Sequence, residues 1–88
     1  MAKYALIIIG PEVDPAGHQE QKRLGDCLAT AESNAATSKQ IERIARGVWL
    51  IPLESDLQGL AGLVKCAADW KIPARTLMFD EKPSFLQS

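Results

Sequence analysis

Residue types on which small enzymes and metal-binding domains depend are scarce in this chain. Its 88 residues include one histidine and two cysteines, and no Cys-x-x-Cys motif is present. The sequence therefore has no signature of a redox or zinc site. No glycine-rich loop has the lysine and spacing that bind phosphate, and the histidine lies in a polar segment, away from both cysteines. A nucleophile with its base is thus not indicated, and we expect no organic cofactor.

An excess of charge of one sign and long apolar runs are missing too. Ten basic and eleven acidic side chains give a formal net charge of −1, whereas nucleic-acid-binding domains usually carry a clear basic excess. The apolar run at residues 4–9 is far too short to span a bilayer, and no signal-peptide pattern is present. Cys27 and Cys66 lie in apolar helix patterns and are expected to be reduced, buried thiols. These features predict a cytoplasmic protein without membrane contact.

Three short apolar runs, at residues 3–9, 48–53 and 74–79, are typical of β-strands. The first contains ALIII, which does not alternate with polar residues, as in a central strand covered on both faces. Hydrophobic residues make up 47% of the chain, which is generous for so small a domain. Part of the apolar surface is therefore expected at an interface between chains.

Residues 15–32 have the spacing of an amphipathic helix. Asp14 suits the N-cap position, and Pro15 suits the first helical position, where its missing N–H is not needed. We expect Ser33-Asn34 to end the helix, because asparagine tolerates the left-handed conformation. The apolar stripe consists of Leu24, Cys27, Leu28 and Ala31.

A second helix pattern covers about residues 56–70, with Ser55 or Asp56 as its cap. One apolar stripe is expected to face the sheet. A second stripe is expected either to pack on the first helix or to form a homodimer interface. The first stripe consists of Leu57, Leu60, Ala61, Val64, Ala67 and Ala68. The interface candidates are Leu63, Cys66 and Trp70, with Phe85 and Leu86 of the tail.

Residues 37–45 fit two structures. As a helix, the segment begins with a capping-box match and places Ile41 and Ile44 on one face. As a strand, it pairs with residues 48–53 across Arg46-Gly47, and the two isoleucines then require a bulge or two covered faces. Topology favours the strand, because a charged fourth strand makes a protected edge for the sheet.

The predicted order of elements is β-α-β-β-α-β. This order resembles the ferredoxin-like α+β sandwich, in which two helices cover one face of a four-stranded sheet with spatial order 4-1-3-2. We expect strands one and three to lie side by side and parallel in the centre. The alternative is a three-stranded α/β layer with residues 38–46 helical. Residues 1–88 are expected to form a single domain with a short C-terminal tail at 80–88.

The segment RIARGVWLIPL, with the helix and strand that follow, is similar to CRISPR-associated adaptation nucleases and their antitoxin-like relatives. The likeness covers residues 36–79 and consists of hydropathy and a tryptophan in the third strand, without a motif. It implies a metal-dependent nuclease or a nucleic-acid-binding protein. That family has an aspartate at the end of its first strand, where this chain has Ile9-Gly10 and the nearest acid is Glu12. No catalytic residue is carried over.

Parallel central strands would assemble an acidic rim. The connections after strands one and three, and both helix N-termini, would then meet at one end of the sheet. Carboxylate oxygens and an imidazole are suitable ligands for a divalent cation. The alternative roles for these residues are helix capping and solvated loops. The candidate metal ligands are Glu12, Asp14, His18, Glu54 and Asp56.

Basic residues near the second strand suggest a nucleic-acid interface. Lys39, Arg43 and Arg46 would line one flank of the sheet, with Trp49 and Tyr4 stacking on bases. The alternative for Trp49 is burial in the core or in an interface between chains.

Three hypotheses about function follow. The leading one is a non-enzymatic binding or interaction module that acts as a homodimer or on a protein partner. The second is a metal-dependent nuclease or nucleic-acid-binding protein of the adaptation-nuclease or antitoxin type. The third is a small-ligand sensor.

Overall fold

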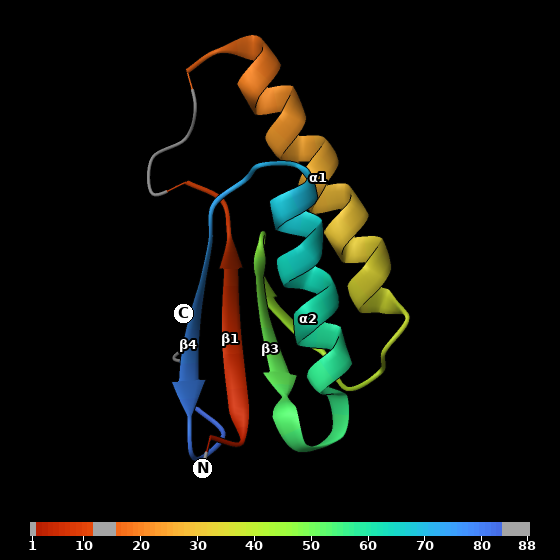
Figure 1. Cartoon of the computed structure of the whole chain (residues 1–88), viewed down its shortest axis with the longest axis vertical. Coiled ribbons are helices and arrows are strands. Elements are labelled where there is room, and N and C mark those ends of the chain that lie inside the picture. Colours follow the sequence, from red (N-terminus) through yellow and green to blue (C-terminus); the bar gives the residue numbers. More distant parts are fainter. Residues whose placement is uncertain (1, 12–15, 84–88) are drawn as a thin grey trace.

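In the computed structural model, two helices cover one face of a four-stranded antiparallel sheet (Figure 1). Residues 2–11 and 16–83 are described. The strands are arranged β2-β3-β1-β4, so β1 and β3 are central. The predicted α+β ferredoxin-like order is confirmed, and the alternative with residues 38–46 helical is wrong. The elements are β1 (Tyr4–Ile9), α1 (His18–Ala36), β2 (Glu42–Ala45), β3 (Val48–Pro52), α2 (Leu53–Asp69) and β4 (Ala74–Phe79).

The central strands run antiparallel, which corrects the sequence-based expectation. Tyr4 lies opposite Pro52, and Ile8 lies opposite Val48. The chain reverses direction on entering α1, again on entering β2, and a third time at the hairpin into β3. An odd number of reversals separates β1 from β3, so the two strands must point in opposite directions.

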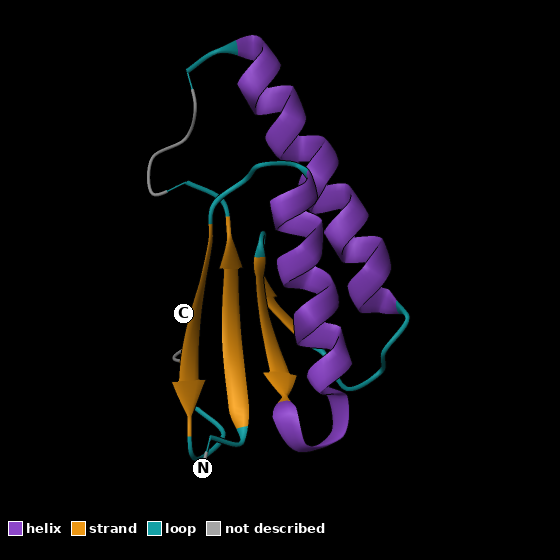
Figure 2. Cartoon of the chain, in the orientation of Figure 1, coloured by secondary structure: helices purple, strands orange, loops and turns teal. Residues whose placement is uncertain are grey.

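The alternation of side chains along β1 and β3 defines two faces of the sheet. Ile7 and Ile9 face the helices and belong to the core, together with Trp49. Leu6 and Leu50 lie opposite each other on the helix-free face, and both are buried. Positions on both faces of β1 are therefore buried, as its unbroken apolar run predicts. Figure 2 shows that both helices lie on one side of the sheet.

Helix α1 extends one turn further than predicted. Its C-cap is Thr37, whose hydroxyl donates a hydrogen bond to the Asn34 carbonyl at 2.7 Å. Ser33-Asn34 does not end the helix, because Ala35 continues the buried stripe. At the other end, Gly17 is the N-cap. The predicted cap Asp14 and the predicted first helical residue Pro15 lie outside the described residues, but the helix begins later than predicted, at His18.

Helix α2 has a break in its first turn, at Asp56. This residue has non-helical φ and ψ of −150° and 52°, and its Oδ1 accepts a hydrogen bond from the Gly59 N–H at 3.0 Å. An aspartate that accepts a bond from the N–H three residues later is an N-cap. Asp56 is therefore confirmed as the cap of the main part of the helix.

A tight turn at Arg46-Gly47 joins β2 to β3. Ala45 lies opposite Val48, and the register shifts between Arg43 and Ala45. The shift is the bulge that a strand at this position requires. Gly47 has a φ of 78°, and its carbonyl accepts a hydrogen bond from the Ile9 N–H at 2.8 Å. The hairpin is thus fixed directly against the end of β1.

Candidate functional site

The predicted acidic rim is divided between the two ends of the sheet. Because β1 and β3 are antiparallel, the chain leaves β1 at one end and leaves β3 at the other. His18, at the start of α1, is therefore far from Glu54 and Asp56, at the start of α2 (Figure 1). Within residues 2–11 and 16–83, no group of three His, Cys, Asp or Glu side chains could hold a metal ion. Glu12 and Asp14 lie outside these ranges.

The position of the Asp56 carboxylate is explained by helix capping and by packing. Its Oδ1 caps the helix, and its Oδ2 is buried without a hydrogen-bond partner in the described part of the chain. A Cβ added at Gly59 would lie 2.7 Å from this Oδ2 and 2.8 Å from Ile41 Cδ1. Gly59 therefore lets α2 approach the segment before β2, which is a structural use of a small residue.

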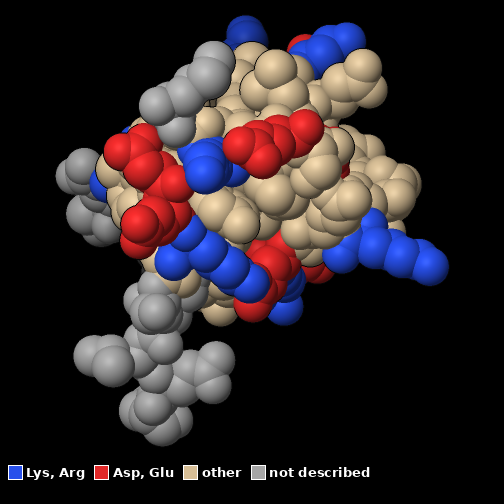
Figure 3. All heavy atoms as spheres, turned by 90° about the horizontal axis from the view of Figure 1, so that it is seen from below, with Lys and Arg blue, Asp and Glu red and all other residues tan. Residues whose placement is uncertain are grey.

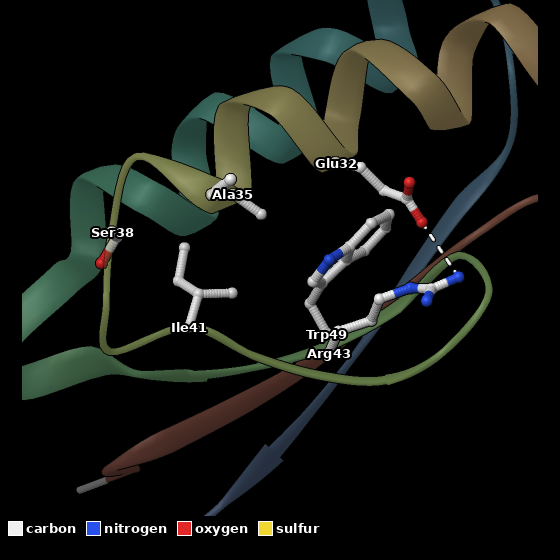
Figure 4. Close-up of a pocket in the computed structure, with 7 residues that line it drawn as sticks. Glu32, Ala35, Ser38, Ile41, Arg43 and Trp49 are labelled. Carbon is white, nitrogen blue, oxygen red and sulfur yellow. Dashed lines mark ion pairs between the residues drawn. The ribbon is translucent and has the colours of Figure 1, made fainter.

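A hollow of about 260 Å³ between α1 and β2 contains one of the basic candidates. Figure 4 shows Arg43 and Glu32 at one side of this hollow, and Ile41 and Ser38 at the other. Arg43 Nη2 lies 2.9 Å from Glu32 Oε1, and both side chains are about half exposed. The charge of Arg43 is thus balanced by an acid of α1.

The two aromatic residues proposed to stack on bases lie on opposite faces of the sheet. Trp49 is only 1% exposed and belongs to the core under the helices, so its burial is confirmed. Tyr4 shares the helix-free face with Leu6. Lys39 and Arg46 are exposed, but no exposed tryptophan of the described residues accompanies them. On the end of the molecule in Figure 3, the basic and acidic side chains of the described residues are mixed.

The proposed interface stripe of α2 packs within the chain. Leu63 and Cys66 are buried in the core, and the partly buried Trp70 packs against it. Cys66 Sγ donates a weak hydrogen bond to the Cys27 carbonyl of α1 at 3.9 Å. Packing within the chain therefore accounts for Leu63 and Cys66, whereas Trp70 remains partly exposed. Phe85 and Leu86 lie outside the described residues.

The stripe predicted to face the sheet is divided, which corrects that prediction. Leu60 and Ala67 are buried, but Leu57 and Val64 are 62% and 43% exposed. The sheet and α1 together cover the side of α2 around Leu63, and not the whole of the predicted stripe. At about 100° per residue, Leu57 and Val64 lie on the side of the helix away from α1. That side is turned toward β4, because α1 flanks the opposite side of α2 and the strands follow in the order β3, β1, β4 (Figure 1).

Strand β4 is exposed on both faces along residues 74–78. Met78, 56% exposed, lies opposite Ala5 on the helix side of the sheet. Leu77, 50% exposed, lies opposite Leu6 on the helix-free face. We define the β4 surface as Leu57, Val64, Leu77 and Met78, which are the four exposed large apolar side chains of the described residues. The sequence contains one indication of this surface. The fourth strand is expected at an edge of the sheet, yet it has a single charge and no proline.

The two cysteines are free and buried where α1 meets α2. Burial, reinforced by the neighbouring Cys66 thiol, raises the pKa of the Cys27 thiol to about 11. The neutral thiol is therefore favoured in the folded chain, whereas a nucleophilic cysteine needs the thiolate. This environment is that of a structural cysteine.

The raised pKa predicts that the folded chain loses stability as the pH rises from about 9 to about 11. Above pH 9 the unfolded state releases the Cys27 proton while the folded state retains it, so the free energy of unfolding falls. Urea unfolding of the wild type and of Cys27→Ala at several pH values measures this contribution. We expect the wild type to show the steeper fall, and equal slopes would contradict the assignment.

Comparisons with known proteins identify no relative. No family model, no curated protein and no solved structure matches the chain. The likeness to adaptation nucleases therefore has no support from these comparisons, and the structure supports only the ferredoxin-like pattern. No helix within the described residues is long and apolar enough to cross a membrane. The fold defines the class of this protein, a small α+β domain with ferredoxin-like order.

Proposed function

We propose that this protein is a non-enzymatic interaction module that acts as a homodimer through the β4 surface. The observation that carries the proposal is the position of the exposed apolar side chains. Two of them lie on β4, and the other two lie on the side of α2 that faces away from α1. Leu77 and Met78 lie on opposite faces of β4, so the exposed apolar side chains gather around the β4 edge of the sheet. Exposed apolar side chains gathered in this way are typical of a protein–protein contact.

The two edges of the sheet differ, and the difference supports the proposal. The β2 edge is four residues long, is bulged, and carries Glu42 and Arg43. Charge, bulges and short length are the means by which proteins protect a free edge. The β4 edge is six residues long, regular in register, and carries only Arg75 as a charge. An edge of this kind is expected to be covered in the working form of the protein.

Sedimentation velocity from micromolar to near-millimolar concentration tests the proposal. We expect the wild type to sediment as a dimer at the upper end. Met78→Lys places a charge in the β4 surface and is expected to raise the dimer dissociation constant at least about tenfold, which corresponds to about 1.4 kcal/mol. Because Met78 is mostly exposed, the fold of the monomer should tolerate this change.

Gln58→Lys is the matched control, because it adds the same charge on the exposed, outward side of α2. It is expected to leave the dimer unchanged. A wild type that remains monomeric throughout the range would contradict the proposal, as would equal weakening by both variants.

A further inference from the structure

We infer that two copies of the chain pair β4 with β4, antiparallel, so that the two sheets join into one across a two-fold axis. This inference rests on the proposed function and specifies how the β4 surface is used. The partner is a second copy of this chain. The evidence is the direction of the backbone groups of β4, its pattern of side chains, and the charges at its two ends.

The hydrogen bonds between β1 and β4 show which backbone groups of β4 point outward. The Gly10 N–H donates to the Pro73 carbonyl at 2.8 Å, and the register continues with Ile8 opposite Arg75 and Leu6 opposite Leu77. In an antiparallel ladder hydrogen-bonded pairs alternate. The N–H and C=O groups of the odd-numbered residues of β4 therefore point to β1.

The corresponding groups of Ala74, Thr76 and Met78 point away from the sheet. No strand of the described chain lies on that side of β4, because β4 is the last strand in the order. Three residues in alternation thus offer donors and acceptors to an added strand. This is the arrangement by which one chain extends the sheet of another.

The side chains select a register for self-pairing. Opposed residues of antiparallel strands share a face. A two-fold axis normal to the sheet therefore lies midway between the two strands and places one residue of β4 opposite its own copy. An axis at Leu77 places Thr76 opposite Met78 of the second copy, and both residues have outward backbone groups. The two Leu77 side chains then meet in a pair without hydrogen bonds, where side chains are closest. An axis at Thr76 would instead place Leu77 opposite Arg75 of the second copy.

The charges favour a second copy over an unrelated strand. Arg75 lies at the beginning of β4, and Asp80 and Glu81 follow its end. The next residue, Lys82, has its Nζ 3.6 Å from Glu42 Oε2 of β2. Antiparallel self-pairing brings the basic beginning of one strand beside the acidic end of the other, twice across the axis. Opposite charges on neighbouring strands stabilise the pairing, whereas like charges oppose it.

Disulfide trapping tests the register. In this arrangement the two Cα atoms of residue 77 are about 4.5 Å apart, which is within the range of a disulfide. We expect Leu77→Cys to form a cross-linked dimer under mild oxidation. The matched control is Arg75→Cys, on the same face of β4. Its two copies would be about 14 Å apart, and they are expected to remain uncross-linked. The wild type measures the background of cross-linking through Cys27 and Cys66, which are both buried.

The failure of this inference is distinguishable from the failure of the proposed function. A wild type that sediments as a dimer, combined with a Leu77→Cys variant that does not cross-link or with equal cross-linking of both variants, would overturn the β4 pairing alone. A monomeric wild type would overturn both.

Amide hydrogen exchange on the unmodified chain provides a second test that needs no variant. The N–H groups of Thr76 and Met78 are expected to exchange slowly at high protein concentration and rapidly on dilution. Those of Arg75 and Leu77, which point to β1, are expected to be protected at both concentrations. Rapid exchange at Thr76 and Met78 in a sample that sediments as a dimer would overturn the inference.

Discussion

Replacement of Trp49 by alanine is expected to lower the free energy of unfolding by about 3–5 kcal/mol, as truncation of a buried aromatic residue does. Trp49 is 1% exposed and is the largest fully buried side chain of the described residues. It lies between Ile7 and Arg43 in the register of the sheet and lines the hollow under α1. Urea unfolding followed by far-UV circular dichroism measures the loss.

A loss of this size is most of the stability of a small domain, since native proteins are stable by about 5–15 kcal/mol and short chains bury less surface. Trp70→Ala is the matched control, because Trp70 is only partly buried against the same core. It is expected to cost clearly less. Equal losses in the two variants, or a loss below about 1 kcal/mol for Trp49→Ala, would contradict the central place of Trp49 in the core.

Replacement of Gly47 by alanine is expected to cost about 2–4 kcal/mol, for two reasons that add. The φ of 78° at Gly47 is a conformation that residues with a Cβ adopt only with strain. An added Cβ would also lie 2.7 Å from the backbone oxygen of Ile9, which cannot move aside as a flexible side chain would. The free energy of unfolding, measured as for Trp49, checks this expectation.

Gly62→Ala is the control for the effect of replacing a glycine by alanine at a position without strain or close contacts. Gly62 lies in the exposed part of α2, and a Cβ added there would meet no atom of the described residues within 4 Å beyond the adjoining backbone of its own helix. Alanine is preferred to glycine in a helix by about 1 kcal/mol, so this variant is expected to be more stable than the wild type. A Gly47→Ala variant as stable as the wild type would show that the turn tolerates a side chain and that its packing on Ile9 is loose.

The sequence by itself determined most of the elements, and the order of the strands in the sheet followed from the resemblance of that pattern to the ferredoxin-like sandwich. Apolar runs, the cap at Asp56 and the turn at Arg46-Gly47 act over a few neighbouring residues, so they can be recognised without tertiary structure. The choice of a strand for β2 followed from the need for a protected edge, and the structure has that strand with its bulge. The predicted cap Asp14 and the metal candidate Glu12 lie outside the described residues.

Only the tertiary structure decided which apolar surfaces are covered. The helix pattern of α2 contains several apolar stripes, and the position of α1 decided that Leu63 and Cys66 are buried while Leu57 and Val64 are exposed. The direction of β3 decided that His18 and Glu54 lie at opposite ends of the molecule. The β4 surface is exposed because α2 lies over β1 and β3 and leaves β4 largely uncovered (Figure 1). Burial depends on how whole elements pack against each other, and the local spacing of residues does not specify that arrangement.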